Sequence, residues 1–109
     1  MHANGYIKMH LPEFLRKHRE MMGLPQRKVA AFLDIDTATY SKIENGKYFP
    51  CKEQIDKIAD VLNCEARELQ KIWLADKLIQ VAEESEDVAI EALELANKSF
   101  ESKKNEQDI

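Results

Sequence analysis

Residues 24–50 of the chain read LPQRKVAAFLDIDTATYSKIENGKYFP, a stretch that holds two short helical patterns joined by a tight turn. The first pattern spans residues 26–33 and the second spans residues 37–45. Between them, residues 34–36 read Asp-Ile-Asp, and aspartate both tolerates the left-handed backbone conformation and caps helices. Gly46 then ends the second pattern, because glycine is the usual residue after a helix. The stretch therefore predicts two consecutive short helices with a sharp turn between them.

Amphipathic patterns continue on both sides of this stretch. Pro12 favours the first turn of a preceding helix that runs to Met22. Apolar residues recur at helical spacing over residues 52–62 and again over residues 65–84. A sixth pattern follows Ser85, which is a good helix cap. Because no strand pattern or internal repeat is present, the sequence predicts an all-α protein. The predicted core consists of Phe14, Leu15, Val29, Leu33, Tyr40, Ile43, Ile55, Ile58 and Leu62.

Composition narrows the class of protein further. Of the 109 residues, 44% are hydrophobic and 33% are charged, which is typical of a folded helical domain. No apolar run reaches the roughly 18 residues that span a bilayer. Residues 1–10 lack the apolar segment of a signal peptide, so we expect a cytoplasmic protein. Cys51 and Cys64 are not spaced as metal ligands, and we expect reduced, partly buried thiols, no metal and no cofactor.

The charge is segregated along the chain. The net charge of −4 at first argues against a nucleic-acid partner. Residues 1–52, however, contain nine Lys and Arg against five Asp and Glu, a net charge of +4. Residues 53–109 contain seven against fifteen, a net charge of −8. Since a local basic patch can bind phosphate even in an acidic protein, the first half remains a candidate for binding DNA.

Several residues of the opening stretch match one known pattern in a single frame. Gln26 starts the second helix, Ala30 lies in its middle, residues 41–47 read SKIENGK, and Pro50 precedes a Leu/Ile-rich helix. This arrangement resembles the helix-turn-helix family of phage repressors and Cro proteins, the XRE type. The resemblance covers about sixty residues and does not reach residues 75–109. It implies a five-helix lambda-repressor-like domain over residues 1–70. Amphipathic helices over residues 71–104 and a frayed tail over residues 105–109 complete the predicted organisation.

The resemblance implies that the helix over residues 37–45 enters the major groove of operator DNA. Its exposed face carries short neutral or basic side chains, which the groove can admit. Lys42 is implied to read a base, although a phosphate contact alone is the alternative. Thr37 is either a base contact or mainly a helix cap, and Gln26 is implied to contact a phosphate at a helix N-terminus. The predicted DNA-binding residues are Gln26, Thr37, Ala38, Thr39, Ser41, Lys42, Asn45, Lys47 and Tyr48.

The resemblance also implies a buried ion pair between Arg19 and Glu44, with two separate exposed charges as the alternative. Three residues depart from the family pattern. Pro25 replaces the usual hydroxyl cap before the second helix, and Asp34 replaces the usual glycine of the turn. Phe32 stands where the family has a charged residue, which suggests that another part of the protein covers it.

The C-terminal extension adds two helices to a family domain that is already complete. Their apolar side chains predict a dimer interface that includes Trp73, Leu78, Ile79 and Leu93. A module that senses a ligand or a partner is one alternative, and a brace that thickens the core is another. No cluster of residues resembles a small-molecule pocket.

Together these features predict a transcriptional regulator that binds double-stranded operator DNA as a homodimer. The whole chain also resembles small regulators that accompany DNA-methyltransferase and restriction genes. Antitoxins and repressors of phages or conjugative elements remain alternatives, as does a protein-interaction module that has lost DNA binding. An enzyme is not expected, because the sequence has no Gly-rich phosphate loop, no Ser/His/Asp set and no metal-spaced ligands.

Overall fold

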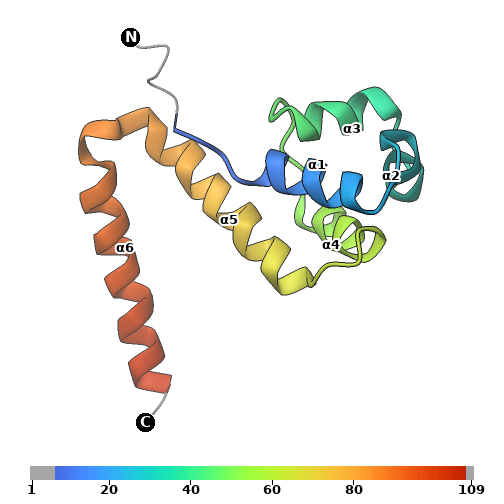
Figure 1. The fold of residues 1–109 in the computed structure, drawn as a ribbon. Helices are drawn as coiled ribbons and strands as arrows, with labels where there is room; N and C mark the ends of the chain where they lie inside the picture. The colour runs from blue at the N-terminus through green and yellow to red at the C-terminus, as the bar shows by residue number, and fades with distance from the viewer. Residues whose placement is uncertain (1–6, 108–109) are drawn as a thin grey trace. The chain divides into compact units, whose positions relative to one another are not determined.

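The computed structural model describes residues 7–107, and every regular element within that range is helical (Figure 1). The all-α prediction is therefore confirmed. Contacts divide the chain into a first unit, residues 1–78, and a second unit, residues 79–109. The elements are α1 (Leu11–Met21), α2 (Gln26–Leu33), α3 (Thr37–Glu44), α4 (Lys52–Val61), α5 (Ala66–Ala82), the 3-10 turn η1 (Glu83–Ser85) and α6 (Glu86–Gln107).

The ends of the first four helices lie within one residue of the predicted ends, whereas the later ones differ. The pattern over residues 65–84 predicts one unbroken helix, but α5 ends at Ala82 and η1 follows. Ser85, the predicted cap of the sixth helix, lies in that 3-10 turn. Helix α6 continues to Gln107, so residues 105–107 are helical and not frayed, and residues 108–109 lie outside the described range.

Left-handed residues and one side-chain cap set the turns around α2 and α3. Gly23 has φ +69° after α1, and Asp34 has φ +60° at the end of α2. Asp36 caps α3, since its carboxylate accepts a hydrogen bond from the amide of Thr39 at 2.7 Å. The Asp-Ile-Asp turn therefore uses one aspartate for the backbone conformation and the other for the cap, as the sequence predicts.

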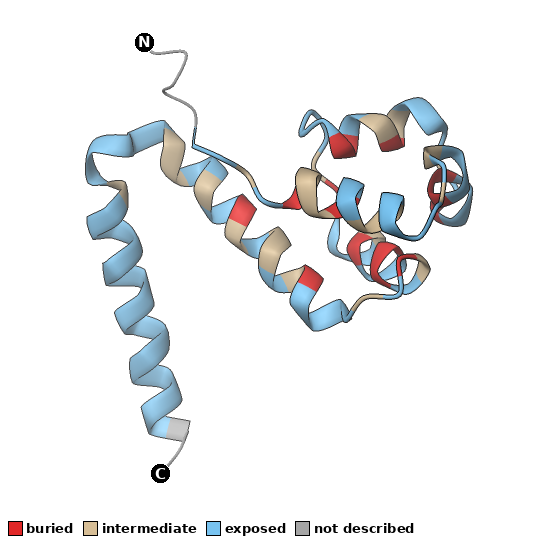
Figure 2. Cartoon of the chain, viewed as in Figure 1, coloured by how far each residue is buried: buried red, intermediate tan, exposed pale blue. Residues whose placement is uncertain are grey.

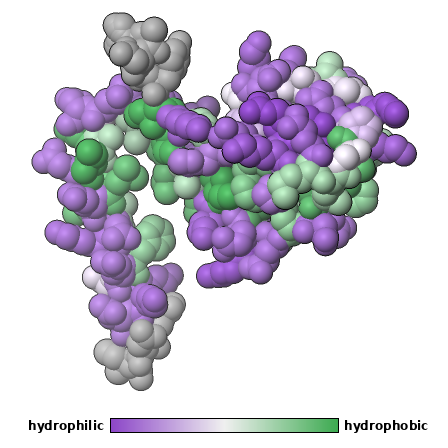
Figure 3. Space-filling view, in the orientation of Figure 1, coloured by the Kyte–Doolittle hydropathy of each residue, from purple (hydrophilic) through white to green (hydrophobic). Residues whose placement is uncertain are grey.

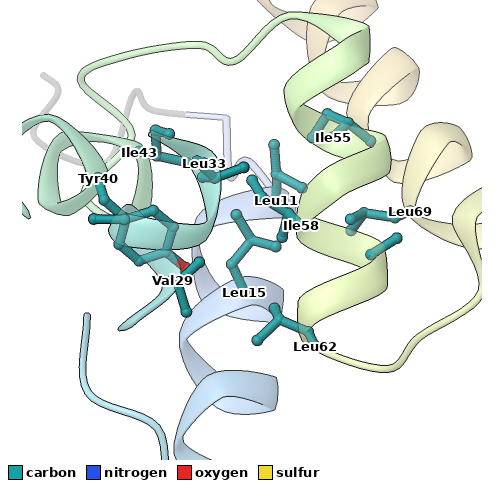
Figure 4. Packing of buried hydrophobic residues seen from close by; sticks show 12 residues of the cluster. Leu11, Leu15, Val29, Leu33, Tyr40, Ile43, Ile55, Ile58, Leu62 and Leu69 are labelled. Carbon is teal, nitrogen blue, oxygen red and sulfur yellow. The ribbon is translucent and has the colours of Figure 1, made fainter. Parts of the chain in front are cut away.

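The core of the first unit lies between α1, α2, α3, α4 and the first turns of α5. Figure 2 shows no buried residue along the described part of α6, and Figure 4 shows the buried apolar side chains gathered between the helices of the first unit. Eight of the nine predicted core residues are buried, whereas Phe14 is only partly buried at the margin. The buried apolar residues are Leu11, Leu15, Val29, Ala30, Leu33, Tyr40, Ile43, Ile55, Ile58, Ala59, Leu62 and Leu69.

The first unit extends beyond the family domain that the sequence places at residues 1–70. Trp73 on α5 donates a hydrogen bond from its indole nitrogen to the carbonyl of Pro50 at 2.7 Å. Its ring also stacks on Phe49, with 6.1 Å between ring centroids, and the Lys77 ammonium lies 4.5 Å from the indole centroid. The middle of α5 therefore holds the loop that follows α3.

Asp76 is a buried carboxylate that caps α1 from α5. Its side-chain oxygens accept hydrogen bonds from the backbone amides of His10 at 3.0 Å and Leu11 at 2.7 Å. The first amides of a helix have no partner within the helix, and a negative charge beside them is favourable. The side chain of His10, at the N-cap position of α1, makes no capping hydrogen bond. Asp76 therefore joins α1 to α5 across 65 residues of sequence.

We expect Asp76→Ala to lower the free energy of unfolding by about 1–3 kcal/mol, because it leaves the buried Leu11 amide without an acceptor. Thermal and urea unfolding followed by circular dichroism measure the loss. The matched control is Asp60→Ala, at an exposed aspartate on α4, which should change stability by less than about 0.5 kcal/mol. Equal effects of the two substitutions would contradict the capping role.

In the second unit, α6 carries exposed side chains along nearly its whole length (Figure 2). Apolar side chains lie among the hydrophilic ones of this helix (Figure 3). Val88, Ile90, Leu95 and Phe100 are all exposed. The free cysteines belong to the first unit, and Cys64 is partly buried as expected, but Cys51 is exposed.

Candidate nucleic-acid interface

Helix α3 packs by one face and exposes the other. Tyr40, Ile43 and Glu44 are buried on the inner face, and α2 packs against α3. Ala30 in the middle of α2 is buried too, and so small a side chain lets packed helix backbones approach closely. The outer face of α3 lies at the upper edge of the first unit in Figure 1, where Figure 3 is mainly hydrophilic. The arrangement presents a narrow polar helix surface of the kind that enters a major groove.

The structure brings eight of the nine predicted DNA-binding residues onto α3 and the loop after it. Thr39 and Ser41 are half-buried, and the other six are exposed. The loop is fixed to the helix end, because the amides of Lys47 and Tyr48 both donate to the carbonyl of Lys42, at 2.8 and 3.1 Å. Gly46 makes this return possible with φ +75°. The six exposed residues are Thr37, Ala38, Lys42, Asn45, Lys47 and Tyr48.

A buried ion pair joins α1 to the end of α3. The Nε and Nη2 atoms of Arg19 donate to the two carboxylate oxygens of Glu44 at 2.7 and 3.0 Å, a bidentate geometry. The Arg19 side chain is 12% exposed and that of Glu44 is 2% exposed. Arg19 also donates from Nη1 to the carbonyl of Leu24 at 2.8 Å, so the same guanidinium fixes the loop before α2.

Gln26, the ninth predicted DNA-binding residue, takes part in this pair. Its side-chain amide donates to Glu44 Oε1 at 3.0 Å, so the network connects α1, α2 and α3. The sequence predicts a phosphate contact for Gln26 and gives no sign of this bond, because residues 26 and 44 share no helix. Pro25, the cap position of α2, makes no side-chain capping bond. The N-terminal end of α2 thus has a side chain committed inward to Glu44.

The charges of the network are stabilised in their ionised forms. Burial alone would raise the pKa of Glu44, but its interactions with Arg19, Tyr40 and Gln26, in this order of size, together outweigh burial and hold this pKa below its ordinary value. The hydrogen bond to Glu44 raises the pKa of Arg19 against the opposing effect of burial. Burial and the neighbouring Glu44 carboxylate raise the pKa of Tyr40 far above its ordinary value. The Tyr40 hydroxyl is buried, and no atom of the described residues meets it in hydrogen-bond geometry.

The exposed surface of α1, α2 and α3 carries several cations. Arg16 on α1 and Lys28 on α2 are exposed, as are Lys42 and Lys47 around the end of α3. Phe32, which the sequence places beneath a covering element, is instead 48% exposed. Within residues 7–107, no cluster of His, Cys, Asp or Glu is arranged to hold a metal ion, and no helix is long and apolar enough to cross a membrane.

Comparison with known proteins identifies the family of the chain. The family model described as Helix-turn-helix matches residues 15–69, about half of the chain, and the chain belongs to this family. The chain is also similar to the cryptic phage CTXphi transcriptional repressor RstR of Vibrio cholerae serotype O1 (strain ATCC 39315 / El Tor Inaba N16961). The two are 32% identical over 91 residues, which cover 75% of this chain and 81% of that repressor. No solved structure matches the chain. Family and relative together support a DNA-binding transcriptional regulator.

Proposed function

We propose that the chain is a transcriptional repressor that binds a two-fold operator as a homodimer and reads each half-site with α3. The observation that carries this proposal is the polar outer face of α3, held rigidly by the buried Arg19–Glu44–Gln26 network. A recognition helix must keep its orientation while its exposed side chains meet base edges. The similarity to a phage repressor supports the direction of regulation.

The side chains divide into base-reading and phosphate-binding groups by their place on α3. Thr37 and Ala38 form the first turn of the helix, the part that reaches base edges in this docking geometry. Lys42 lies one turn further on and can donate to guanine O6 and N7. Asn45, Lys47 and Tyr48 follow the helix end, where contacts to the phosphate backbone fix the register of the protein on DNA.

The outer face of α3 favours DNA binding over the alternative of a protein-interaction module. A helix that no longer binds DNA does not require short, uncharged or basic side chains on its exposed face. Thr37, Ala38 and Lys42 are all exposed in the structure, and none is acidic or bulky. A phosphate-lined groove favours such a surface, whereas a basic protein partner favours an acidic one.

We expect Lys42→Ala to cost roughly 1–3 kcal/mol on the preferred operator and to relax preference at one base pair. The matched control is Lys47→Ala, which removes the same charge from the loop and should weaken binding to all sequences alike. Binding of both variants to the operator and to scrambled DNA, measured at one fixed salt concentration, separates the two effects. A loss for Lys42→Ala that is equal on both DNAs would make Lys42 a phosphate contact.

Gln26→Ala is a poorer control than Lys47→Ala. Removal of the Gln26 side chain also removes a hydrogen bond to the buried Glu44 carboxylate. Weaker DNA binding by that variant would mix a lost phosphate contact with a disturbed α3. Lys47 is exposed and makes no side-chain bond to the network among the described residues, so its removal leaves the position of α3 unchanged.

The homodimer part of the proposal rests on the second unit and the end of the first. Of the four predicted dimerisation residues, Leu78 and Leu93 are exposed and Ile79 is partly buried. Trp73 contacts Pro50 and Phe49 within its own chain. Leu78, Ile79 and Leu93 therefore remain the proposed interface residues, and Trp73 supports the loop after α3.

A further inference from the structure

Helix α6 divides its charges along its length. Between residues 86 and 94 it carries four acidic residues and no basic one. Between residues 98 and 104 it carries three lysines and one glutamate. The first half of α6 is therefore acidic, whereas its second half, with Glu106 included, carries three lysines against two glutamates.

The same helix carries an apolar stripe that alternates small and large side chains. Ala89, Leu93, Ala96 and Phe100 follow one another at spacings of four, three and four residues, which places them on one face. We call this set the α6 stripe. Leu93 is 39% exposed and Phe100 is 74% exposed, so the large members of the stripe are available to a partner.

We propose that α6 pairs antiparallel with α6 of a second copy of this chain, through the α6 stripe. The pairing rests on the homodimer of the proposed function and adds its direction and register. In this register Leu93 lies opposite Ala96 of the second copy, and Phe100 lies opposite Ala89 of the second copy. Each large side chain meets a small one, so the two stripes fill the space between the helices. A parallel pair would place Phe100 against Phe100 and alanine against alanine, which leaves overpacked layers beside cavities.

Charge selects the same direction. Glu86 and Lys103 continue the spacing of the α6 stripe at its two ends, three residues before Ala89 and three after Phe100, and the antiparallel register places Glu86 opposite Lys103 of the second copy. The two-fold axis repeats this ion pair at both ends. A parallel pair would instead set Glu86 against Glu86 and Lys103 against Lys103. Exposed ion pairs add little stability each, but like charges at facing positions disfavour the parallel arrangement and opposite charges favour the antiparallel one.

The direction also fixes where the two first units attach. Glu86, which begins α6, lies opposite a residue 17 positions further along the partner helix. At about 1.5 Å per residue, the two α6 helices begin about 25 Å apart along the pair. The first units are then attached at opposite ends of the helix pair, whereas a parallel pair would attach both at one end.

Disulfide cross-linking in the full-length protein tests the register. The background variant Cys51→Ser removes the exposed native thiol. Glu86→Cys and Lys103→Cys are made separately in this background, carry different affinity tags, and are mixed under a mild oxidant. We expect the mixed 86–103 disulfide, identified by peptide mass, to exceed the 86–86 disulfide at least ten-fold. The matched control mixes Glu86→Cys with Lys98→Cys, since residue 98 lies on the helix face opposite the α6 stripe.

Sedimentation, circular dichroism and operator binding of each variant accompany the cross-linking. Helical variants that form 86–103 disulfides, and form few with Lys98→Cys, support the antiparallel pair. A dominant 86–86 disulfide overturns it in favour of a parallel dimer, and dimeric operator binding still stands. A dimer without any α6 disulfide also overturns it and places the interface elsewhere. A full-length chain that stays monomeric, including on DNA, overturns the homodimer of the proposed function as well.

Discussion

Arg19→Ala and Glu44→Ala should each lower the free energy of unfolding by about 3–5 kcal/mol, since either change leaves a buried charge without its partner. The two side chains form a bidentate pair at 2.7 and 3.0 Å, and both are largely buried. The double variant should lose clearly less than the sum of the two single losses, because it strands neither charge. Denaturant unfolding of the four proteins at neutral pH gives the coupling free energy directly.

Arg16→Ala is the matched control for Arg19→Ala. It removes an arginine from the same helix at an exposed position, so the change in stability should stay within about 0.5 kcal/mol. A strictly additive double variant would mean that Arg19 and Glu44 do not act as a pair. Because Glu44 ends α3, the single variants should also lose operator affinity at temperatures where they remain folded.

A chain that ends at Ala82 should fold, remain monomeric and bind the operator about 10²–10⁴-fold more weakly than the full chain. The first unit keeps its core and both of its contacts from α5, namely the Trp73 bond to Pro50 and the Asp76 cap of α1. This chain lacks α6, so two copies are no longer joined and cannot bind the two half-sites of one operator as a unit. Sedimentation at matched concentration and operator titration measure the two effects.

A second truncation, ending at Leu69, separates the role of α5 from that of α6. It removes Trp73 and Asp76, so we expect a markedly less stable domain than the chain ending at Ala82. Circular dichroism melts of both truncations provide the comparison. A dimeric chain ending at Ala82 would contradict the role of α6 and place the interface before residue 83, where Leu78 and Ile79 of α5 are the candidates.

Local chemistry made much of the fold predictable. Proline near the start of α1, glycine after α1 and α3, and the Asp-Ile-Asp turn each act through their own backbone preferences. Helical spacing of apolar residues located the core, because one buried face determines both the helix and its packing. The outer face of α3 followed from the same spacing, since residues that are not buried must lie on the exposed side.

Contacts between distant residues were beyond the reach of such patterns. Asp76 interrupts an apolar stripe on α5, and that interruption was the available signal of a special role; its partners, the first amides of α1, carry no sequence signature. The sequence predicts a phosphate contact for Gln26 because its position at the start of a helix is visible in the sequence. Its hydrogen bond to Glu44 is not visible there, since it depends on how α2 and α3 cross. The sequence likewise predicts a dimer contact for Trp73, because a large apolar side chain does not reveal whether it packs on its own chain or on a partner.

The most direct test of the central claim is selection of preferred sites from random double-stranded DNA with the full-length protein. If α3 reads a half-site in each of two symmetric copies, the enriched sequences should contain two inverted half-sites. Their centres should lie about 10–10.5 base pairs apart, or a whole multiple of that spacing. The same selection with the Lys42→Ala variant should lose the base preference at one base pair of each half-site. Recovery of sequences indistinguishable from the starting pool, or of sites without two-fold symmetry, would contradict a dimeric operator-reading repressor.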